Sequence, residues 1–130
     1  MLSFSTDAAT VREYCALRDA SGLGAFPDEN ARIGLANTLT AVWLRHEGRL
    51  IGMARIIGDG GCFAQVTDVA IHPDFQRQGL GARVMEQLLL QARETLPKDL
   101  YISLIAGPGA ENLYAKFGFK SLHGMARTLP

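Results

Sequence analysis

The stretch from Asp68 to Arg83 contains the residues whose types and spacing best fit chemistry with an anion. An apolar segment is followed by a short loop and then by two glycines, Gly79 and Gly81, that open a long amphipathic run. The first amides of a helix lack carbonyl partners within the helix, and the helix dipole gives them partial positive charge. Because a glycine has no side chain, a phosphate can approach this backbone closely. The segment therefore predicts a phosphate-binding turn at the start of a helix.

The charges around this turn agree with an external anion. No acidic residue stands between Gln76 and Met85, although helices usually carry acids in their first turn. Arg77 and Arg83 add positive charge there instead. An ordinary strand-to-helix turn with solvated arginines is the alternative that the residues leave open. Other phosphate motifs fit less well, because Val84 stands where a dinucleotide fingerprint needs its third glycine and the Lys-Ser/Thr pair of a P-loop is absent.

Hydrophobic periodicity defines the elements that must position this turn. The clearest helix is expected from Gly79 to Leu96, where the apolar side chains form one stripe. Shorter helices are expected from Asp7 or Thr10 to about Asp19, from Asp28 to Ala36, and over 110–117. Strands are expected over 2–5, 41–45, 50–57, 63–71 and 100–105, with two weak strands over 119–122 and 125–129.

The order of these elements predicts an α+β fold with a mixed, mostly antiparallel sheet. Tight-turn signals at Glu47-Gly48 and over 58–61 join three strands into an antiparallel meander. A strand, a helix and a further strand require a right-handed crossover, so the strands over 63–71 and 100–105 should lie parallel. The second of these is almost wholly apolar, which predicts a central strand covered on both faces.

Composition narrows the class of protein. The sequence has 130 residues, with 13 basic and 13 acidic side chains and a formal net charge of zero. This length predicts one domain over 1–130, and the neutral balance argues against nucleic acid as a partner. Cys15 and Cys62 lack metal-ligand spacing and are expected to be reduced, buried thiols. With no long apolar segment and no signal-peptide pattern, we expect a cytoplasmic protein that binds no membrane.

Two motifs resemble the GNAT superfamily of N-acetyltransferases. Residues 76–81, Gln-Arg-Gln-Gly-Leu-Gly, resemble its Gln/Arg-x-x-Gly-x-Gly/Ala signature, and residues 69–73 resemble the strand that faces its cofactor. Ala110 and residues 113–119 resemble its late helix, usually Leu-Tyr-x-x-x-Gly-Phe. The resemblance covers roughly residues 40–122, and the two motifs stand in the family's order, separated by one helix-strand unit.

The resemblance implies a GNAT-like α/β/α sandwich whose sheet splays between its fourth and fifth strands, with acetyl-CoA held in the gap. Main-chain groups of Val69 and Ile71 would pair with the pantetheine arm as an added strand does. The signature would hold the pyrophosphate, so the remaining expected cofactor-binding residues are Gln76, Arg77, Gln78, Gly79, Leu80, Gly81, Ala82 and Tyr114. In this family the acetyl group passes directly to an amine, so we expect neither an acyl-enzyme nor a metal.

Direct transfer requires two proton movements. The amine must lose a proton, because a lysine-like ammonium has a pKa of about 10.4, and the departing thiolate benefits from a proton donor. Tyr114 matches the family's general acid by position, with an ordinary core aromatic as the alternative. Asp68 is our candidate for the general base, with an ion pair to Arg55 as the alternative. A water relay is also open, and a bulge near Asp68 would change the face to which it points.

The sequence also departs from the family pattern. Gly107 stands seven residues before the tyrosine, where the family often has asparagine. The acceptor side carries no signature, although Phe26, Asp28, Glu29 and Trp43 could line a pocket for a cationic amine or serve as cap and core. We expect an acetyl-CoA-dependent N-acetyltransferase acting on a primary amine of a small molecule or a protein. The alternative is a non-catalytic acyl-CoA-binding or sensing module, and a homodimer through the last strands is a further hypothesis.

Overall fold

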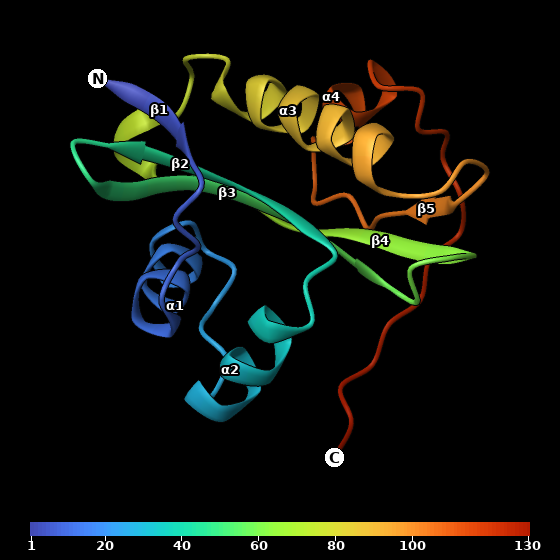
Figure 1. Ribbon diagram of the computed structural model, residues 1–130, viewed down its shortest axis with the longest axis horizontal. Helices are drawn as coiled ribbons and strands as arrows, with labels where there is room; N and C mark the ends of the chain where they lie inside the picture. The colour runs from blue at the N-terminus through green and yellow to red at the C-terminus, as the bar shows by residue number, and fades with distance from the viewer.

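Five strands form one open sheet in the computed structural model, which describes residues 1–130 (Figure 1). The strands lie side by side in chain order: β1 (Leu2–Ser5), β2 (Thr40–His46), β3 (Arg49–Gly58), β4 (Phe63–Ile71) and β5 (Tyr101–Ser103). The first four pair antiparallel, and β5 pairs parallel to β4. The sheet is therefore mixed and mostly antiparallel, as predicted.

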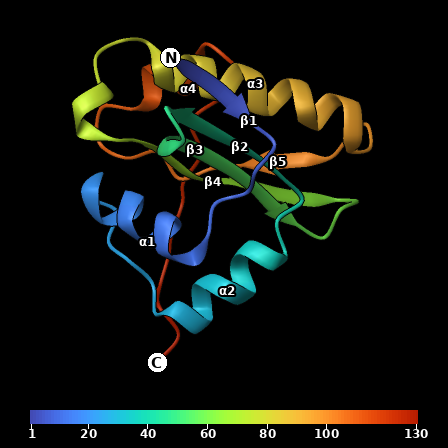
Figure 2. The same ribbon diagram turned by 60° about the vertical axis from the view of Figure 1, so that its left-hand side comes forward.

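Helices cover both faces of the sheet. They are α1 (Val11–Ala20), α2 (Asp28–Ala36), α3 (Leu80–Thr95) and α4 (Glu111–Ala115), with a single 3-10 turn, η1 (Pro73–Phe75), after β4. Figures 1 and 2 show α1 and α2 on one side of the sheet and α3 and α4 on the other. This layering confirms the predicted α/β/α sandwich.

Each face of the sheet carries its own apolar core. The stripe of α3 meets inward-facing side chains of β2, β3 and β4; the buried members are Val42, Leu44, Ile51, Ala54, Ile56, Ala64, Val66, Leu80, Val84, Met85, Leu88 and Ala92. Opposite, Tyr14 and Leu17 of α1 and Ala31 of α2 pack on Trp43 and Met53. Full burial of a large apolar side chain stabilises the fold by about 1.5–3 kcal/mol, so these two clusters fix the layers.

Local signals account for α1 and for the first hairpin. The Thr10 hydroxyl accepts from the Glu13 amide at 3.1 Å, and the Glu13 carboxylate accepts from the Thr10 amide at 3.0 Å. This capping box makes Thr10, not Asp7, the cap of α1. Glu47 and Gly48 join β2 to β3 with φ values of 51° and 82°, the left-handed pair that a two-residue hairpin turn requires.

The C-terminal part of the chain differs from the sequence-based expectation. The predicted central strand over 100–105 is the short strand β5 at the edge of the sheet, and its Tyr101 is 52% exposed. The two weak strands predicted over 119–122 and 125–129 are absent. An apolar segment becomes a covered central strand only when a further strand pairs with its free edge, and no segment of this chain does so. The last helix, α4, also ends earlier than predicted, at Ala115.

The two cysteines are less buried than the sequence predicts. Both cysteines are free thiols, but Cys62 is exposed in the turn before β4 and Cys15 is half-buried, so the expectation of two buried thiols is wrong. None of the helices combines the length and the apolar character that crossing a bilayer requires.

Candidate active site

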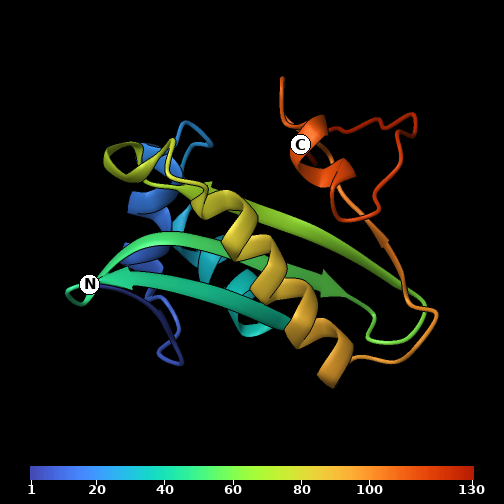
Figure 3. The same cartoon turned by 90° about the horizontal axis from the view of Figure 1, so that it is seen from above.

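Strands β4 and β5 separate soon after they meet. Residues 63–65 of β4 pair with β5, and β4 then continues to Ile71 with no strand on that side. Figure 3 shows the two strands together at one end and diverging toward the other. The main chain along this edge of β4 is therefore open to an extended ligand that pairs as an added strand. The splay predicted between the fourth and fifth strands is present.

A β-bulge interrupts β4 along this open stretch. Asp68 and Val69 together oppose Ala54 of β3, and Asp68 has a φ of 56°. The extra residue reverses the alternation of side chains. Val66 packs beneath α3, whereas Ala70 packs on the face that α1 and α2 cover. The bulge thus turns Asp68 toward the first two helices.

The turn between η1 and α3 presents a run of unpaired main-chain amides. The N–H groups from Arg77 to Ala82 donate to no protein acceptor, and the next amide, that of Arg83, donates to the Gly79 carbonyl at 3.3 Å. Residues 76–79 are exposed, and the first turn of α3 has no acidic side chain. Free donors at the positive end of a sixteen-residue helix suit an anion such as a diphosphate.

Two residues with left-handed backbone shape this turn. Gly79 has a φ of 74° and Arg77 a φ of 65°, and a Cβ on Gly79 would meet no atom within 4 Å. The Gln76 side-chain amide donates to the Ile71 carbonyl at 2.9 Å, which ties the turn to the end of β4. Gln76 therefore holds the loop through its side chain, and the Ile71 carbonyl already has a donor.

The two arginines near the turn point to different surroundings. Arg83 lies over the Phe4 ring of β1, with its guanidinium carbon 5.8 Å from the ring centroid. Arg77 is exposed within the turn itself. Both arginines are exposed, and Arg77, which belongs to the turn, adds positive charge beside the free amides.

Asp68 lies at the centre of a buried polar cluster. Its Oδ2 accepts from the Tyr14 hydroxyl at 2.6 Å and from Arg55 Nε at 2.9 Å, and its Oδ1 accepts from Arg18 Nη1. The side chain is 2% exposed. The ion pair with Arg55, which the sequence left open as the alternative, is therefore present. Because both carboxylate oxygens are already engaged by strong donors, the geometry gives no support to Asp68 as a general base.

The Asp68 cluster joins α1 and α2 to the bulge. Arg55 Nη1 donates to the Gly34 carbonyl at 2.9 Å and to Thr38 Oγ1 at 2.7 Å, at the end of α2. Burial, followed by the hydrogen bond to Asp68 and its charge, raises the pKa of Tyr14 to about 12. Sequence reasoning missed Tyr14 and Arg18. Their spacing of four residues, which puts both on one face of α1, was the available signal.

Tyr114 lies half-buried on α4, at the same end of α3 as the turn. Its ring centroid is 6.3 Å from that of Phe119, and burial raises the pKa of its phenol. The neighbouring Leu113 has its Cδ2 atom 3.6 Å from the position that a Cβ on Gly81 would take. The small residue at 81 thus lets α4 approach the first turn of α3, which brings Tyr114 to the candidate site.

The residues considered for an acceptor pocket do not gather in one place. Trp43 is 7% exposed in the core beneath α1, and Phe26 lies against the Arg18 guanidinium at 4.5 Å. Glu29 pairs with Arg32 on the surface of α2. Trp43 therefore belongs to the core, Phe26 stacks on an arginine, and Glu29 belongs to a surface ion pair.

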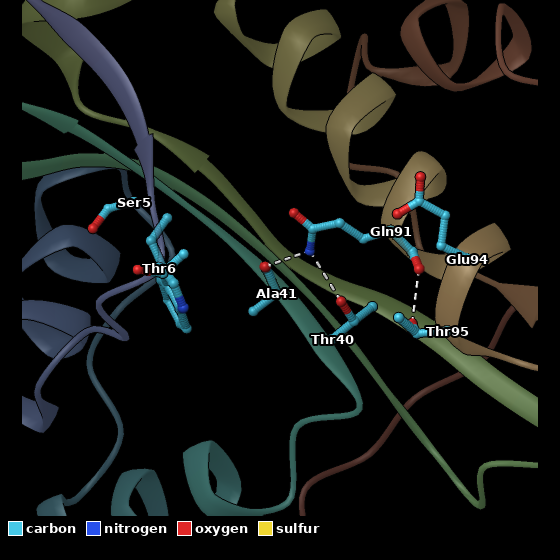
Figure 4. Close-up of a pocket in the computed structure, with 8 residues that line it drawn as sticks. Ser5, Thr6, Thr40, Ala41, Gln91, Glu94 and Thr95 are labelled. Carbon is cyan, nitrogen blue, oxygen red and sulfur yellow. Dashed lines mark hydrogen bonds between the residues drawn. The ribbon is translucent and has the colours of Figure 1, made fainter.

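A separate hollow of about 380 Å³ lies between the last turns of α3 and strands β1 and β2 (Figure 4). It is lined by Ser5, Thr6, Thr40, Ala41, Trp43, Gln91, Glu94 and Thr95. Gln91 Nε2 donates to Thr40 Oγ1 at 3.0 Å and to the Ala41 carbonyl at 2.8 Å, so these polar groups satisfy one another. With a rise of 1.5 Å per residue, Gln91 lies about 15 Å along α3 from Gly81, which separates this hollow from the turn.

An open mixed sheet that splits beside a glycine-rich helix start is the architecture expected of an acetyltransferase. Residues 38–121 match the family described as Acetyltransferase (GNAT) domain, and the chain belongs to this family. A solved structure, the probable acetyltransferase SA2161 from methicillin-resistant Staphylococcus aureus, is 38% identical, with a TM-score of 0.91 over 99% of this chain and 100% of the other. This agreement confirms both the predicted fold and the resemblance from which it was inferred.

Curated relatives carry N-acetyltransferase names. The ycf52 N-acetyltransferase of Pyropia yezoensis is 36% identical over 79% of this chain and 60% of its own length. Serotonin N-acetyltransferase 2, chloroplastic, of Oryza sativa subsp. japonica is 33% identical over 88% of this chain and 68% of its own. The chain spans 40% to 60% of the ycf52 relatives that it matches. Because the rice relative is named chloroplastic, the cytoplasmic location stays a prediction for this chain.

Proposed function

We propose that this protein transfers an acetyl group from acetyl-CoA directly to a primary amine, without an acyl-enzyme. The observation that carries this proposal is the run of free amides from Arg77 to Ala82 beside the open edge of β4. The amides suit a diphosphate, and the strand edge suits an extended arm that contains amide groups. Membership of the GNAT family supports acetyl-CoA as the donor.

The binding residues fall into two groups in this proposal. The main chain from Arg77 to Ala82 would hold the pyrophosphate, and main-chain groups of Val69 and Ile71 would hold the pantetheine arm. Bound acetyl-CoA supplies a thioester whose carbonyl carbon takes the amine and whose sulfur leaves as a thiolate. The chain's own residues bind and orient the donor, and one of them supplies a proton to the departing thiolate.

Tyr114 is the proposed general acid. Burial raises the pKa of its phenol, which keeps the hydroxyl protonated at neutral pH. The departing thiolate can then take the phenolic proton, while a tyrosine serves no comparable purpose in a protein that only binds acyl-CoA. Tyr114 is therefore the residue whose presence favours an enzyme over a non-catalytic acyl-CoA-binding module.

For Asp68 we propose a positioning role in place of the general base. Its contacts with Tyr14, Arg18 and Arg55 hold the bulge of β4 against α1 and α2. A carboxylate paired with two guanidinium groups would have to give up those bonds to accept a proton from the amine. In this proposal the ammonium proton passes to solvent water.

The acceptor is proposed as a primary amine, and residues 1–130 are proposed to act as one domain. The rice relative is named for serotonin, whose alkyl amine is primary, so small primary amines are the first acceptors to test. Protein amines form the second group.

An acetylation assay tests this function. The protein is mixed with acetyl-CoA and a panel of amines, and free thiol is followed together with product mass. We expect thiol release that depends on at least one primary amine, and no acetylated protein when the amine is left out. Coenzyme A binding with no turnover of any amine would favour the non-catalytic binding module.

A further inference from the structure

The hollow of about 380 Å³ between α3 and strands β1 and β2 has hydrogen-bonding groups that the chain itself leaves free (Figure 4). Thr40 Oγ1 accepts from Gln91 Nε2 at 3.0 Å, but the hydroxyl proton of Thr40 has no acceptor. Thr6, which is exposed just after β1, makes no side-chain hydrogen bond. Because a hydroxyl group both donates and accepts, these two residues can bond to a ligand without losing an existing contact.

Trp43 adds a donor without a partner to the same lining. The residue is 7% exposed, it lines the hollow, and its indole N–H donates to no protein acceptor. The one fully buried side-chain atom that lacks a partner is Arg45 Nε, so the indole N–H of Trp43 keeps contact with solvent. The N–H of a largely buried indole ordinarily has an acceptor, which a ligand in the hollow would supply.

The charge of the hollow favours a cation. Glu94 is the only ionisable residue in the lining. Its carboxylate is exposed and takes part in no ion pair or hydrogen bond, so it is free to turn toward a ligand. The hollow also lies at the carboxyl end of α3, where the helix dipole attracts positive charge. Arg93, the basic residue of that last turn, is not part of the lining.

The size and the position of the hollow suit one small molecule outside the candidate active site. Small-molecule sites commonly measure about 300–1,000 Å³, and liquid water occupies about 30 Å³ per molecule, so the space exceeds what a bridging water needs. The Gln91 amide donates to the Ala41 carbonyl at 2.8 Å, which ties α3 to β2 and keeps the hollow formed without a ligand. Gln91 lies about 15 Å along α3 from Gly81, at the opposite end of the helix from the candidate phosphate-binding turn.

We propose that this hollow binds a small organic cation that carries hydroxyl groups, of the amino-sugar class. The ammonium group pairs with Glu94, one ligand hydroxyl accepts from the Trp43 indole, and others exchange hydrogen bonds with Thr6 and Thr40. With a carboxylate and no basic group in the lining, the site selects against anionic ligands. This inference concerns binding at a second site and does not rest on the proposed function.

The fluorescence of Trp43, the only tryptophan in the chain, reports on this site directly. Glucosamine is the probe, titrated into the protein in the absence of acetyl-CoA, and glucose is the matched sugar without the ammonium group. We expect a saturable change in emission with glucosamine in the millimolar range and weaker binding of glucose. A flat titration with glucosamine, or equal binding of the two sugars, would overturn the proposal.

Three variants locate the bound probe. Glu94→Gln keeps the size of the side chain and removes its charge, so the affinity for glucosamine should fall at least about tenfold. Thr6→Val removes a hydroxyl that has no bond within the chain, and it should weaken binding about threefold without disturbing the fold. Glu86→Gln, on the exposed face of the same helix and outside the hollow, is the control and should bind as the wild type does. Unchanged affinity in Glu94→Gln, or an equal loss in Glu86→Gln, would place the sugar elsewhere and refute the site.

Discussion

Tyr114, the proposed general acid, is a packed side chain. Its ring contacts Phe119, and the burial that raises the pKa of its phenol also preserves the proton that the proposed acid catalysis needs. Asp68, by contrast, has no free oxygen with which to accept a proton. Its carboxylate is engaged by two arginines and a tyrosine, which is why we propose that it holds the shape of β4.

Tyr114→Phe should therefore impair chemistry more than binding. Loss of a general acid lowers kcat by about 10²–10⁴-fold, and the ring that packs on Phe119 is kept. We expect calorimetry to show little change in coenzyme A affinity. Tyr101→Phe, at an exposed position on β5, is the matched control and should keep wild-type turnover. Equal turnover of Tyr114→Phe and wild type would remove Tyr114 from the acid's role.

The pH profile of the wild-type protein tests the positioning role of Asp68. If water takes the amine's proton, the acid limb of kcat/KM reflects the free amine and moves with the pKa of the acceptor used. Two acceptors of different basicity should therefore give limbs at different pH values. A limb at one fixed pH for every acceptor would instead identify a titrating base on the protein.

At the scale of elements, the Asp68 cluster links α1 and α2 to the bulged strand beside the open edge. Tyr14 of α1 is 1% exposed, and its hydroxyl donates to Asp68. The turn at the start of α3 is braced independently, through Gln76 and the carbonyl of Ile71. Two separate sets of contacts thus fix β4 and the proposed phosphate-binding turn.

Tyr14→Phe should lower the free energy of unfolding by about 1.5–3 kcal/mol, the usual contribution of a hydrogen bond to a charged group. The pKa of Tyr14 in the folded protein, about 12, lies above the ordinary tyrosine pKa of about 10. This raised pKa adds stability that is complete below pH 10 and is lost as the pH rises toward 12.

Urea unfolding at several pH values measures both effects. The wild type should lose more stability than Tyr14→Phe between pH 10 and 12. Parallel losses in the two proteins would contradict the proposed linkage.

At the scale of the molecule, the parts that the sequence predicted are those whose signals are local. The Glu47-Gly48 hairpin, the span of β4 and the apolar stripe of α3 each depend on residues close in the chain. The Asp68 cluster depends on contacts between residues that are far apart in the chain. Asp68 lies 50 positions from Arg18 and 54 positions from Tyr14, and no local pattern reveals such contacts. The prediction of a central strand over 100–105 was wrong for a similar reason. A central strand needs a second neighbouring strand, and no other segment of this chain pairs with the free edge of β5.

The central claim is that the free amides at the start of α3 bind the diphosphate of coenzyme A. Ala82→Glu places a carboxylate in the first turn, where it favours the helix but competes with an anionic ligand. Ala82→Gln has nearly the same size without the charge. Calorimetry with coenzyme A should show binding to wild type and to Ala82→Gln, and a loss of at least about tenfold in affinity for Ala82→Glu, or about 1.4 kcal/mol. Equal affinity of all three proteins, or no binding to the wild type, would contradict the claim.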